Sequence, residues 1–166
     1  TAVLDFVYDE SGKPFALKYS TDGATFDTYY YVLNLQGDVV KLIQANGHVV
    51  AQYTYDAWGK LISTTGTLAS TLGADNPFRY RGYYYDTETG LYYLMTRYYD
   101  PEVCRFISAD VYMTTGQGVL GGNMWAYCLN NPILYSDTFG ESVTVCILGV
   151  TFTLVELLVI GVAVAV

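Results

Sequence analysis

Charge is scarce in this sequence, and positive charge is the scarcer sign. Charged residues make up 14% of its 166 residues, and 16 acidic residues outnumber 8 basic ones. The net charge of −8 excludes a nucleic-acid binder that works through bulk positive charge. Intrinsic disorder is also excluded, because 52% of the residues are hydrophobic and 18 are tyrosine, whereas disordered chains have few aromatics. The composition favours a folded, β-rich chain.

Cysteine and histidine are too few to build the usual redox or metal sites. The cysteines, Cys104, Cys128 and Cys146, offer neither a disulfide framework nor a paired zinc spacing, so we expect buried thiols. The single histidine, His48, follows an Asn-Gly pair with no ligand at metal spacing, and we expect it to be exposed. A phosphate-binding glycine loop, a dinucleotide fingerprint and a calcium loop are absent as well. The sequence therefore predicts no cofactor and no metal.

A secretory signal is missing from residues 1–20, and the first residue is not methionine, so we expect a piece of a longer chain. Residues 142–166, in contrast, form a hydrophobic tail with one charge, Glu156, and no proline. This tail is long enough to cross a bilayer as a helix from Val143 onward. It is also rich in Val and Thr, which suit buried strands. A transmembrane helix and a strand packed inside the protein therefore both stay open.

Short β-favouring runs separated by glycine turns fill residues 1–65, as expected of an antiparallel meander. A recurring unit ends a strand in Tyr-Asp and then turns through Gly, at residues 8–12, 55–59 and, in expanded form, 85–90. Asp accepts hydrogen bonds from turn amides two residues on, and Gly adopts the special backbone angles. The Asn46-Gly47 pair predicts a type I′ hairpin turn. Because a single hairpin is only marginally stable, we expect the hairpins to stack into a larger sheet.

Dense aromatic motifs follow a Thr/Ser/Gly/Ala-rich linker at residues 64–75. With the Tyr55-Asp56-Ala57-Trp58-Gly59 unit before the linker, the motifs form an ordered series: Asn76-Pro77-Phe78-Arg79-Tyr80-Arg81-Gly82, Tyr85-Asp86-Thr87-Glu88-Thr89-Gly90-Leu91-Tyr92-Tyr93-Leu94, Arg97-Tyr98-Tyr99-Asp100-Pro101, Arg105-Phe106-Ile107-Ser108-Ala109-Asp110 and Ala126-Tyr127-Cys128-Leu129-Asn130-Asn131-Pro132. This series resembles the C-terminal end of the Rhs/YD-repeat core. Residues 1–65 resemble the YD repeats that precede that region.

The resemblance implies a mainly β fold in which antiparallel YD-repeat hairpins form part of a β-shell. It divides the chain into YD-repeat strands at 1–65, an Rhs repeat-associated core at 76–140, and a tail at 142–166 that begins a variable C-terminal region. Within the core we expect one short helix over residues 123–130, because Asn123 suits an N-cap and Pro132 prevents continuation.

The resemblance also implies a function. Shells of this family encapsulate and deliver a C-terminal toxin, and this chain would be the end piece that closes the shell. The implied partners are the protein's own toxin segment, the rest of the shell and, through residues 142–166, a membrane, but no nucleic acid. The implied location is secreted or at the cell surface. A second hypothesis stays open, in which the chain is a surface-anchored, Tyr-rich binding module for carbohydrate or protein ligands.

Self-cleavage is the one reaction that the resemblance implies. By position in the family's motifs, Asp110, Asp137 and Arg105 would carry it. Two carboxylates in a partly dry site share a proton, so one can activate water while the other protonates the leaving amine.

The sequence departs from the family pattern beside these residues, with Cys104 for Gly, Val111 for Pro, Thr138 for Pro and Glu141 for an apolar residue. We therefore expect slow or absent cleavage. The alternative is that these Asp residues only form turns.

The shell hypothesis predicts that residues 1–140 on their own fold poorly or aggregate, because the strand edges left open by the missing shell pair with other chains. Size-exclusion chromatography and thermal melting test this prediction. A monomer with a cooperative melt would contradict it.

Overall fold

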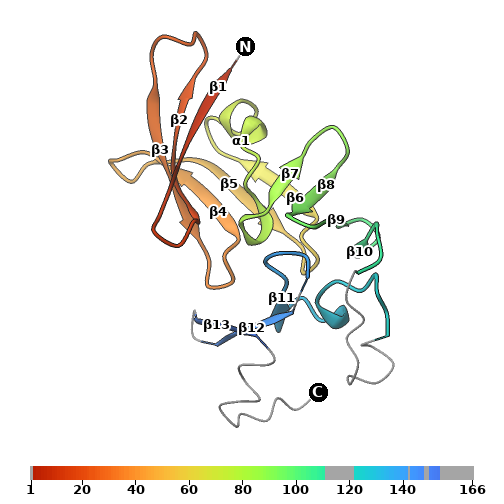
Figure 1. The fold of residues 1–166 in the computed structure, drawn as a ribbon. Coiled ribbons are helices and arrows are strands. Elements are labelled where there is room, and N and C mark those ends of the chain that lie inside the picture. The colour runs from red at the N-terminus through yellow and green to blue at the C-terminus, as the bar shows by residue number, and fades with distance from the viewer. Residues whose placement is uncertain (1, 111–121, 142, 148–149, 154–166) are drawn as a thin grey trace. The chain divides into compact units, whose positions relative to one another are not determined.

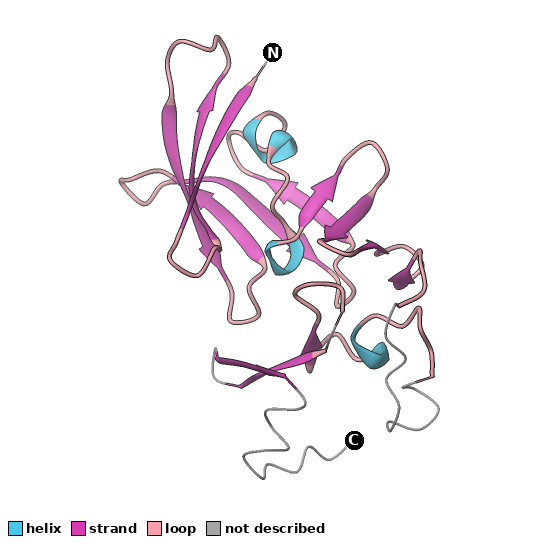
Figure 2. Ribbon diagram, viewed as in Figure 1, coloured by secondary structure: helices cyan, strands magenta, loops and turns pink. Residues whose placement is uncertain are grey.

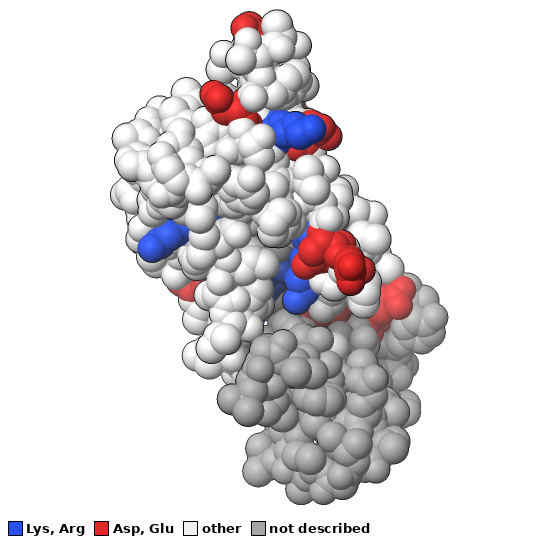
Figure 3. Space-filling model, turned by 90° about the vertical axis from the view of Figure 1, so that its left-hand side faces the viewer, with Lys and Arg blue, Asp and Glu red and all other residues white. Residues whose placement is uncertain are grey.

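A computed structural model of the chain describes residues 2–110, 122–141, 143–147 and 150–153. Strands dominate it and the helices are short, as Figure 2 shows, which confirms the predicted fold class. The chain divides into two compact units, Thr1–Tyr84 and Tyr85–Val166, and each is described by itself. Charged side chains are sparse on the face drawn in Figure 3, in keeping with the composition.

The first unit is built on a six-stranded sheet whose strands follow one another in chain order, each antiparallel to the next (Figure 1). The predicted meander is therefore confirmed. The strands are β1 (Val3–Tyr8), β2 (Pro14–Ser20), β3 (Asp27–Leu33), β4 (Val39–Ile43), β5 (Val49–Tyr55) and β6 (Leu61–Thr65).

The Tyr-Asp turns are held by the aspartate side chain, as predicted. Asp9 Oδ1 accepts hydrogen bonds from the backbone N–H groups of Ser11, at 2.8 Å, and Lys13, at 2.9 Å. Gly12 stands between them with φ 78°, in the left-handed region that glycine tolerates best. Asn34 and Asp56 make the same two contacts, two and four residues ahead, in the turns before β4 and β6. One local hydrogen-bond plan therefore closes three of the hairpins.

The turn at Asn46-Gly47 differs from the prediction. A type I′ turn needs positive φ at both central residues. Here Gly47 N–H bonds the Gln44 carbonyl at 2.9 Å, and only Gly47, with φ 83°, has positive φ. The loop is longer than the two residues of a type I′ hairpin turn, and the left-handed Gly47 follows the turn. His48 is exposed, as expected.

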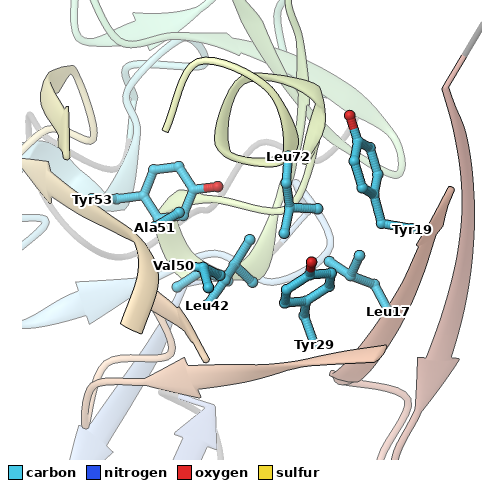
Figure 4. Packing of buried hydrophobic residues seen from close by; sticks show 9 residues of the cluster. Leu17, Tyr19, Tyr29, Leu42, Val50, Ala51, Tyr53 and Leu72 are labelled. Carbon is cyan, nitrogen blue, oxygen red and sulfur yellow. The ribbon is translucent and has the colours of Figure 1, made fainter. Parts of the chain in front are cut away.

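A short helix, α1 (Leu72–Asp75), lies in the segment that the composition marked as a linker. Leu72 is fully buried in the core cluster of the sheet, next to residues such as Leu17, Leu42 and Val50 (Figure 4). The Tyr53 hydroxyl donates to the Gly73 carbonyl at 2.9 Å. One buried leucine and hydrogen bonds from the sheet thus hold the helix. The composition of the segment, which is typical of a loop, does not reveal these tertiary contacts.

The Asn-Pro-Phe-Arg motif follows α1 and fastens it to the sheet. Asn76 is fully buried, and its side chain accepts from the Tyr31 hydroxyl at 2.8 Å and donates to the Phe78 carbonyl at 2.7 Å. Burial raises the pKa of Tyr31, and it raises the pKa of Tyr53 to about 12. Both phenols therefore stay protonated and able to donate at neutral pH.

The second unit contains two small sheets. In the larger, the order is β10-β9-β8-β7, and its strands are β7 (Tyr84–Asp86), β8 (Leu91–Leu94), β9 (Arg97–Asp100) and β10 (Arg105–Phe106). The smaller has the order β11-β12-β13, with β11 (Tyr135–Ser136), β12 (Thr144–Ile147) and β13 (Val150–Thr153).

The helix expected over residues 123–130 is wrong. The segment contains only a three-residue 3-10 turn, Cys128–Asn130, whose Leu129 has a left-handed φ of 51°. Ahead of it, Ala126 forms an isolated antiparallel bridge with Arg105. Asn123 therefore begins a turn and not a helix: its side chain accepts from the Trp125 N–H at 3.2 Å and its carbonyl from the Ala126 N–H at 3.1 Å, and Ala126 then pairs with another segment.

A helix from Val143 onward is also wrong for the first part of the tail. β12 and β13 form an antiparallel hairpin there, and the Ser136 and Thr144 hydroxyls lie 2.9 Å apart between β11 and β12. The strand alternative therefore holds for residues 144–147 and 150–153. The rest of the tail, including Glu156, lies outside the described residues. Among the residues that the structure describes, no helix is long and apolar enough to span a membrane.

The loop between β2 and β3 should weaken in acid. Asp22 Oδ1 accepts from the N–H groups of Thr25, at 2.9 Å, and Ala24, at 2.8 Å, and these bonds lower its pKa from 3.8 to about 2. A lowered pKa stabilises the fold above pH 3.8 and stops doing so as the pH falls through about 2. Hydrogen exchange of these two amides, corrected for intrinsic rates, should show less protection near pH 2 than near pH 6. The non-titrating Asp22→Asn variant should lose that dependence, and equal dependence in both proteins would contradict the prediction.

Candidate active site

The candidate site is organised by a buried arginine at the start of β9. Arg97 follows the tight turn from β8, in which Leu94 pairs with Arg97. The strand alternates, so Arg97 and Tyr99 are buried while Tyr98 is exposed. The Arg97 guanidinium lies over the Phe106 ring, 3.6 Å from its centroid. A charge in this position needs partners for its N–H groups, because burial without them is costly.

Two of those partners are the aspartates that the family resemblance singled out. Arg97 Nη2 lies 2.8 Å from Asp110 Oδ2 and 3.3 Å from Asp137 Oδ2. The Asp137 side chain is 2% exposed and the Asp110 side chain 16%. The structure thus brings together two carboxylates that are 27 positions apart in the sequence, at a single nitrogen atom.

The arginine at this position was missed by sequence reasoning. Arg105 is exposed and lies opposite Asp100 of the neighbouring strand β9, whereas Arg97 is the arginine between the two carboxylates. Arg97 opens the Arg-Tyr-Tyr-Asp-Pro motif, and its alternation with Tyr98 places it on the buried face of β9. An arginine on the buried face of a strand with alternating burial is the sequence signal that could have identified it. The role of Arg105 in cleavage stays a prediction.

Asp137 also forms a turn, and it does so in the manner of the YD repeats. Its Oδ1 accepts from the Glu141 N–H, four residues on, at 3.1 Å. Gly140, three residues on, has φ 73°, as Gly12 has φ 78° in the turn that begins at Asp9. One oxygen of Asp137 therefore serves the turn, and the other faces Arg97.

The Gly140 carbonyl is held from two sides at the same place. Arg97 Nε donates to it at 2.6 Å, and Thr96 Oγ1 lies 2.9 Å away. Thr96 Oγ1 also lies 2.8 Å from the Phe139 carbonyl. The peptide group between Gly140 and Glu141 is thus fixed at its carbonyl by β9 and the turn before it, and at its N–H by Asp137. Chemically, this places a polarised backbone carbonyl beside a pair of carboxylates.

Of the three cysteines, the structure describes the side chains of two. Cys128 is buried, as expected, and Cys104 is half-buried with its Sγ 3.7 Å from the Pro101 carbonyl. Cys146 belongs to a strand whose side chains lie outside the description. Over the described ranges, no group of three or more His, Cys, Asp or Glu side chains could hold a metal ion.

The tyrosines of this unit mostly pack. Tyr92, Tyr99 and Tyr127 are fully buried, and the rings of Tyr99 and Tyr127 lie 4.1 Å apart. Tyr93 and Tyr98 form an exposed cross-strand pair, with centroids 5.1 Å apart. Cross-strand aromatic pairs of this kind stabilise sheets. The structure therefore gives no specific support to a Tyr-rich ligand platform.

Successive antiparallel hairpins, each closed by an Asp or Asn turn with a left-handed glycine, define the first unit as a piece of a YD-repeat sheet. A family model agrees: the Teneurin YD-shell model matches residues 1–129. The chain belongs to the YD-shell family. The Rhs/YD resemblance is thereby confirmed.

Several bacterial proteins are similar to this chain at moderate identity. The chain is 41% identical over 136 residues to "tRNA3(Ser)-specific nuclease WapA" of Bacillus spizizenii, covering 82% of the chain and 6% of that protein. It is 44% identical over 113 residues to "tRNA nuclease WapA" of Bacillus subtilis, covering 68% and 5%. It is 41% identical over 73 residues to "Toxin protein Tse5" of Pseudomonas aeruginosa, covering 44% and 5%. The chain thus spans only about one-twentieth of the length of these relatives.

A solved structure shares the fold. The crystal structure of TcdB2-TccC3 matches with a TM-score of 0.70 at 24% identity, over 82% of this chain and 6% of that one. At this identity the likeness concerns the fold alone.

Loss of Arg97 should loosen the second unit. Arg97→Met keeps the stem but leaves Asp110 and Asp137 without the charge between them, and breaking a buried pair costs about 3–5 kcal/mol. Arg97→Lys should recover part of that loss, because one ammonium cannot reach every acceptor of the guanidinium.

Native-state hydrogen exchange of the Tyr99 and Phe106 amides in the longest natural chain measures the effect. Combining Arg97→Met with Asp110→Asn and Asp137→Asn should restore protection, because the uncompensated charges are then gone. Unchanged protection in Arg97→Met alone would show that the ion pairs do not stabilise this unit.

Proposed function

We propose that this chain is the end piece that closes a β-shell around a C-terminal toxin segment, and that Asp110 and Asp137 cut the chain close to Gly140. One observation carries the proposal. Arg97 contacts both carboxylates and also donates to the Gly140 carbonyl. The acid pair and the last residues of the core therefore meet at Arg97.

The relatives support the encapsulation part of the proposal. Proteins similar to this chain are named as tRNA nucleases, as a double-stranded DNA deaminase toxin and as the toxin protein Tse5. The similar region is a small part of each of them, 5–6% of the length. A region that recurs beside different named activities fits a common delivery device better than a catalytic domain. Secretion of the whole protein, to the medium or the cell surface, is part of this proposal.

The cleavage step needs one proton on the acid pair and one water molecule. With Asp137 protonated, the Asp110 carboxylate takes a proton from water, and the water oxygen forms a bond to the carbonyl carbon of the chain beside the site. The C–N bond then breaks as Asp137 gives its proton to the leaving nitrogen. The products are a new carboxyl group and a new amino group, and the proton taken from water ends on Asp110.

Arg97 has two opposed effects on this reaction. Its positive charge stabilises negative charge that develops on a nearby carbonyl oxygen. The ion pairs with Arg97 are made by ionised carboxylates, whereas cleavage requires that one of the two carry a proton. Because of this opposition, of Glu141 and of the missing proline at Thr138, we expect cleavage to be slow.

Residues 142–166 are then the first part of the enclosed segment. The pairing of β12 with β11 supports a tail that starts as packed strand. Contact of the later tail with a membrane stays a prediction.

Mass spectrometry of the longest natural chain tests the cleavage proposal. We expect slow formation of one new N-terminus within a few residues after Gly140. Asp110→Asn and Asp137→Asn should each lower the rate about 100-fold or more, because an amide neither takes nor gives the proton. Cys104→Ala, a matched change beside the site, should leave the rate unchanged.

The boundary residues give the second arm of this test. Thr138→Pro with Glu141→Leu should accelerate cleavage, since proline fixes the turn and the added negative charge is removed. Cleavage that survives both Asp substitutions would exclude the carboxylate mechanism. A chain that stays uncut even with Thr138→Pro and Glu141→Leu would exclude self-cleavage.

A further inference from the structure

Residues 139–141 form the boundary segment at the end of the core. The turn between β8 and β9 makes more contacts with this segment than a hairpin turn requires. Thr96 is at its tip, and its hydroxyl lies 2.8 Å from the Phe139 carbonyl and 2.9 Å from the Gly140 carbonyl. The Thr96 N–H is 3.4 Å from the Phe139 carbonyl as well. These contacts join segments that are 43 and 44 positions apart in the chain. The turn therefore binds the backbone carbonyls of the boundary segment directly.

The Gly140 position admits glycine only. Its φ is 73°, in the region that L side chains rarely adopt. An added Cβ would lie 2.6 Å from the Leu94 carbonyl oxygen and 2.8 Å from Thr96 Oγ1. The first of these atoms is backbone and cannot turn away. Space and backbone angle thus both select glycine at this point.

Arg97 completes the contacts from the other direction. Its Nε donates to the Gly140 carbonyl at 2.6 Å, while its Nη2 contacts Asp110 and Asp137. Asp137 in turn accepts the Glu141 N–H at 3.1 Å. The carbonyl and the N–H of one peptide group are therefore both bound, and both are bound by groups tied to the acid pair.

We propose that Thr96, Arg97 and the Leu94 carbonyl form a glycine-selecting clamp that sets the register of self-cleavage. The clamp holds residues 139–141 in one position against Asp110 and Asp137, so that a single bond next to it meets the acid pair. Thr96 acts as a positioning residue in this scheme and takes no part in proton transfer. This inference rests on the proposed self-cleavage and adds the feature that the site recognises, a glycine carbonyl.

The position of the cut distinguishes this role from a general effect on stability. Thr96→Val has nearly the same shape but lacks the hydroxyl that contacts two carbonyls. Because the hydrogen bonding of this hydroxyl to two carbonyls is lost, cleavage should slow ~10-fold. The clamp also predicts that the fragments of Thr96→Val begin at more than one residue, whereas wild-type fragments begin at one.

Three further variants isolate the clamp. Thr96→Ser keeps the hydroxyl and should restore both the single N-terminus and a rate within about 3-fold of the wild type. Thr89→Val removes a hydroxyl from another turn of the same unit, where Thr89 Oγ1 contacts Asp86, and should change neither. Gly140→Ala should block cleavage at the wild-type bond. All four variants are made in the longest natural chain and also in the Thr138→Pro, Glu141→Leu background, where cleavage is faster.

The outcomes separate this inference from the proposed function. Cleavage that needs Asp110 and Asp137 but keeps its rate and its single N-terminus in Thr96→Val would overturn the clamp alone. Thr96→Val that matches Thr96→Ser in both readouts would do the same. A chain left uncut in both backgrounds would overturn the self-cleavage proposal and the clamp with it. A slower reaction with scattered N-termini, restored by Thr96→Ser, is the expected result.

Discussion

Hydrogen bonds that two backbone N–H groups donate to one short polar side chain determine where this chain turns. Asp9, Asn34 and Asp56 each bind the amides two and four residues ahead, and each is followed by a left-handed glycine. The turn fixes how the flanking strands pair, so the register of three of the hairpins in the six-stranded sheet follows from it. Asp137 repeats the four-residue contact, with Gly140 in the glycine position. The same local device that closes the hairpins also shapes the boundary of the core.

A buried guanidinium organises the second unit in a different way. Arg97 draws together two carboxylates and the carbonyls of Met124 and Gly140, from segments far apart in sequence. Each contact offsets part of the cost of burying the charge, so the partners depend on one another. The two carboxylates of the proposed reaction thus also contribute to the stability of the second unit. Substitutions here consequently affect chemistry and stability at once, and conservative changes at Thr96 are more informative than removal of Arg97.

The YD-repeat sheet explains why one small region can occur in proteins with different named activities. Its hairpins are closed by their own side chains, and its core is filled by Leu, Val and Tyr from neighbouring strands together with Leu72 from α1. Nothing in that construction depends on the chemistry of a distant domain. The boundary segment, in contrast, is bound at one glycine, Gly140. A chain whose C-terminal sequence varies could keep that glycine.

Local patterns predicted the hairpins, the turn-forming Asp residues and the antiparallel order, because each is decided within about five residues by side-chain-to-backbone bonds and by glycine. The same patterns failed where partners are distant. The linker at 64–75 contains α1, held by the sheet through Leu72 and Tyr53. Residues 123–130 form turns and no α-helix, because Ala126 pairs with Arg105.

For the site, the family motifs in the sequence picked out Asp110 and Asp137 but could not select Arg97 over Arg105 or find the grip of Thr96 on Gly140. Those depend on which face of β9 is buried and on a turn meeting a segment 43 positions away. The sequence by itself determined the repeating turns and the sheet they build. Only the tertiary structure decided that Arg97, Asp110 and Asp137 are buried together. The physical reason is that the cost of burying a charge depends on every segment that surrounds it.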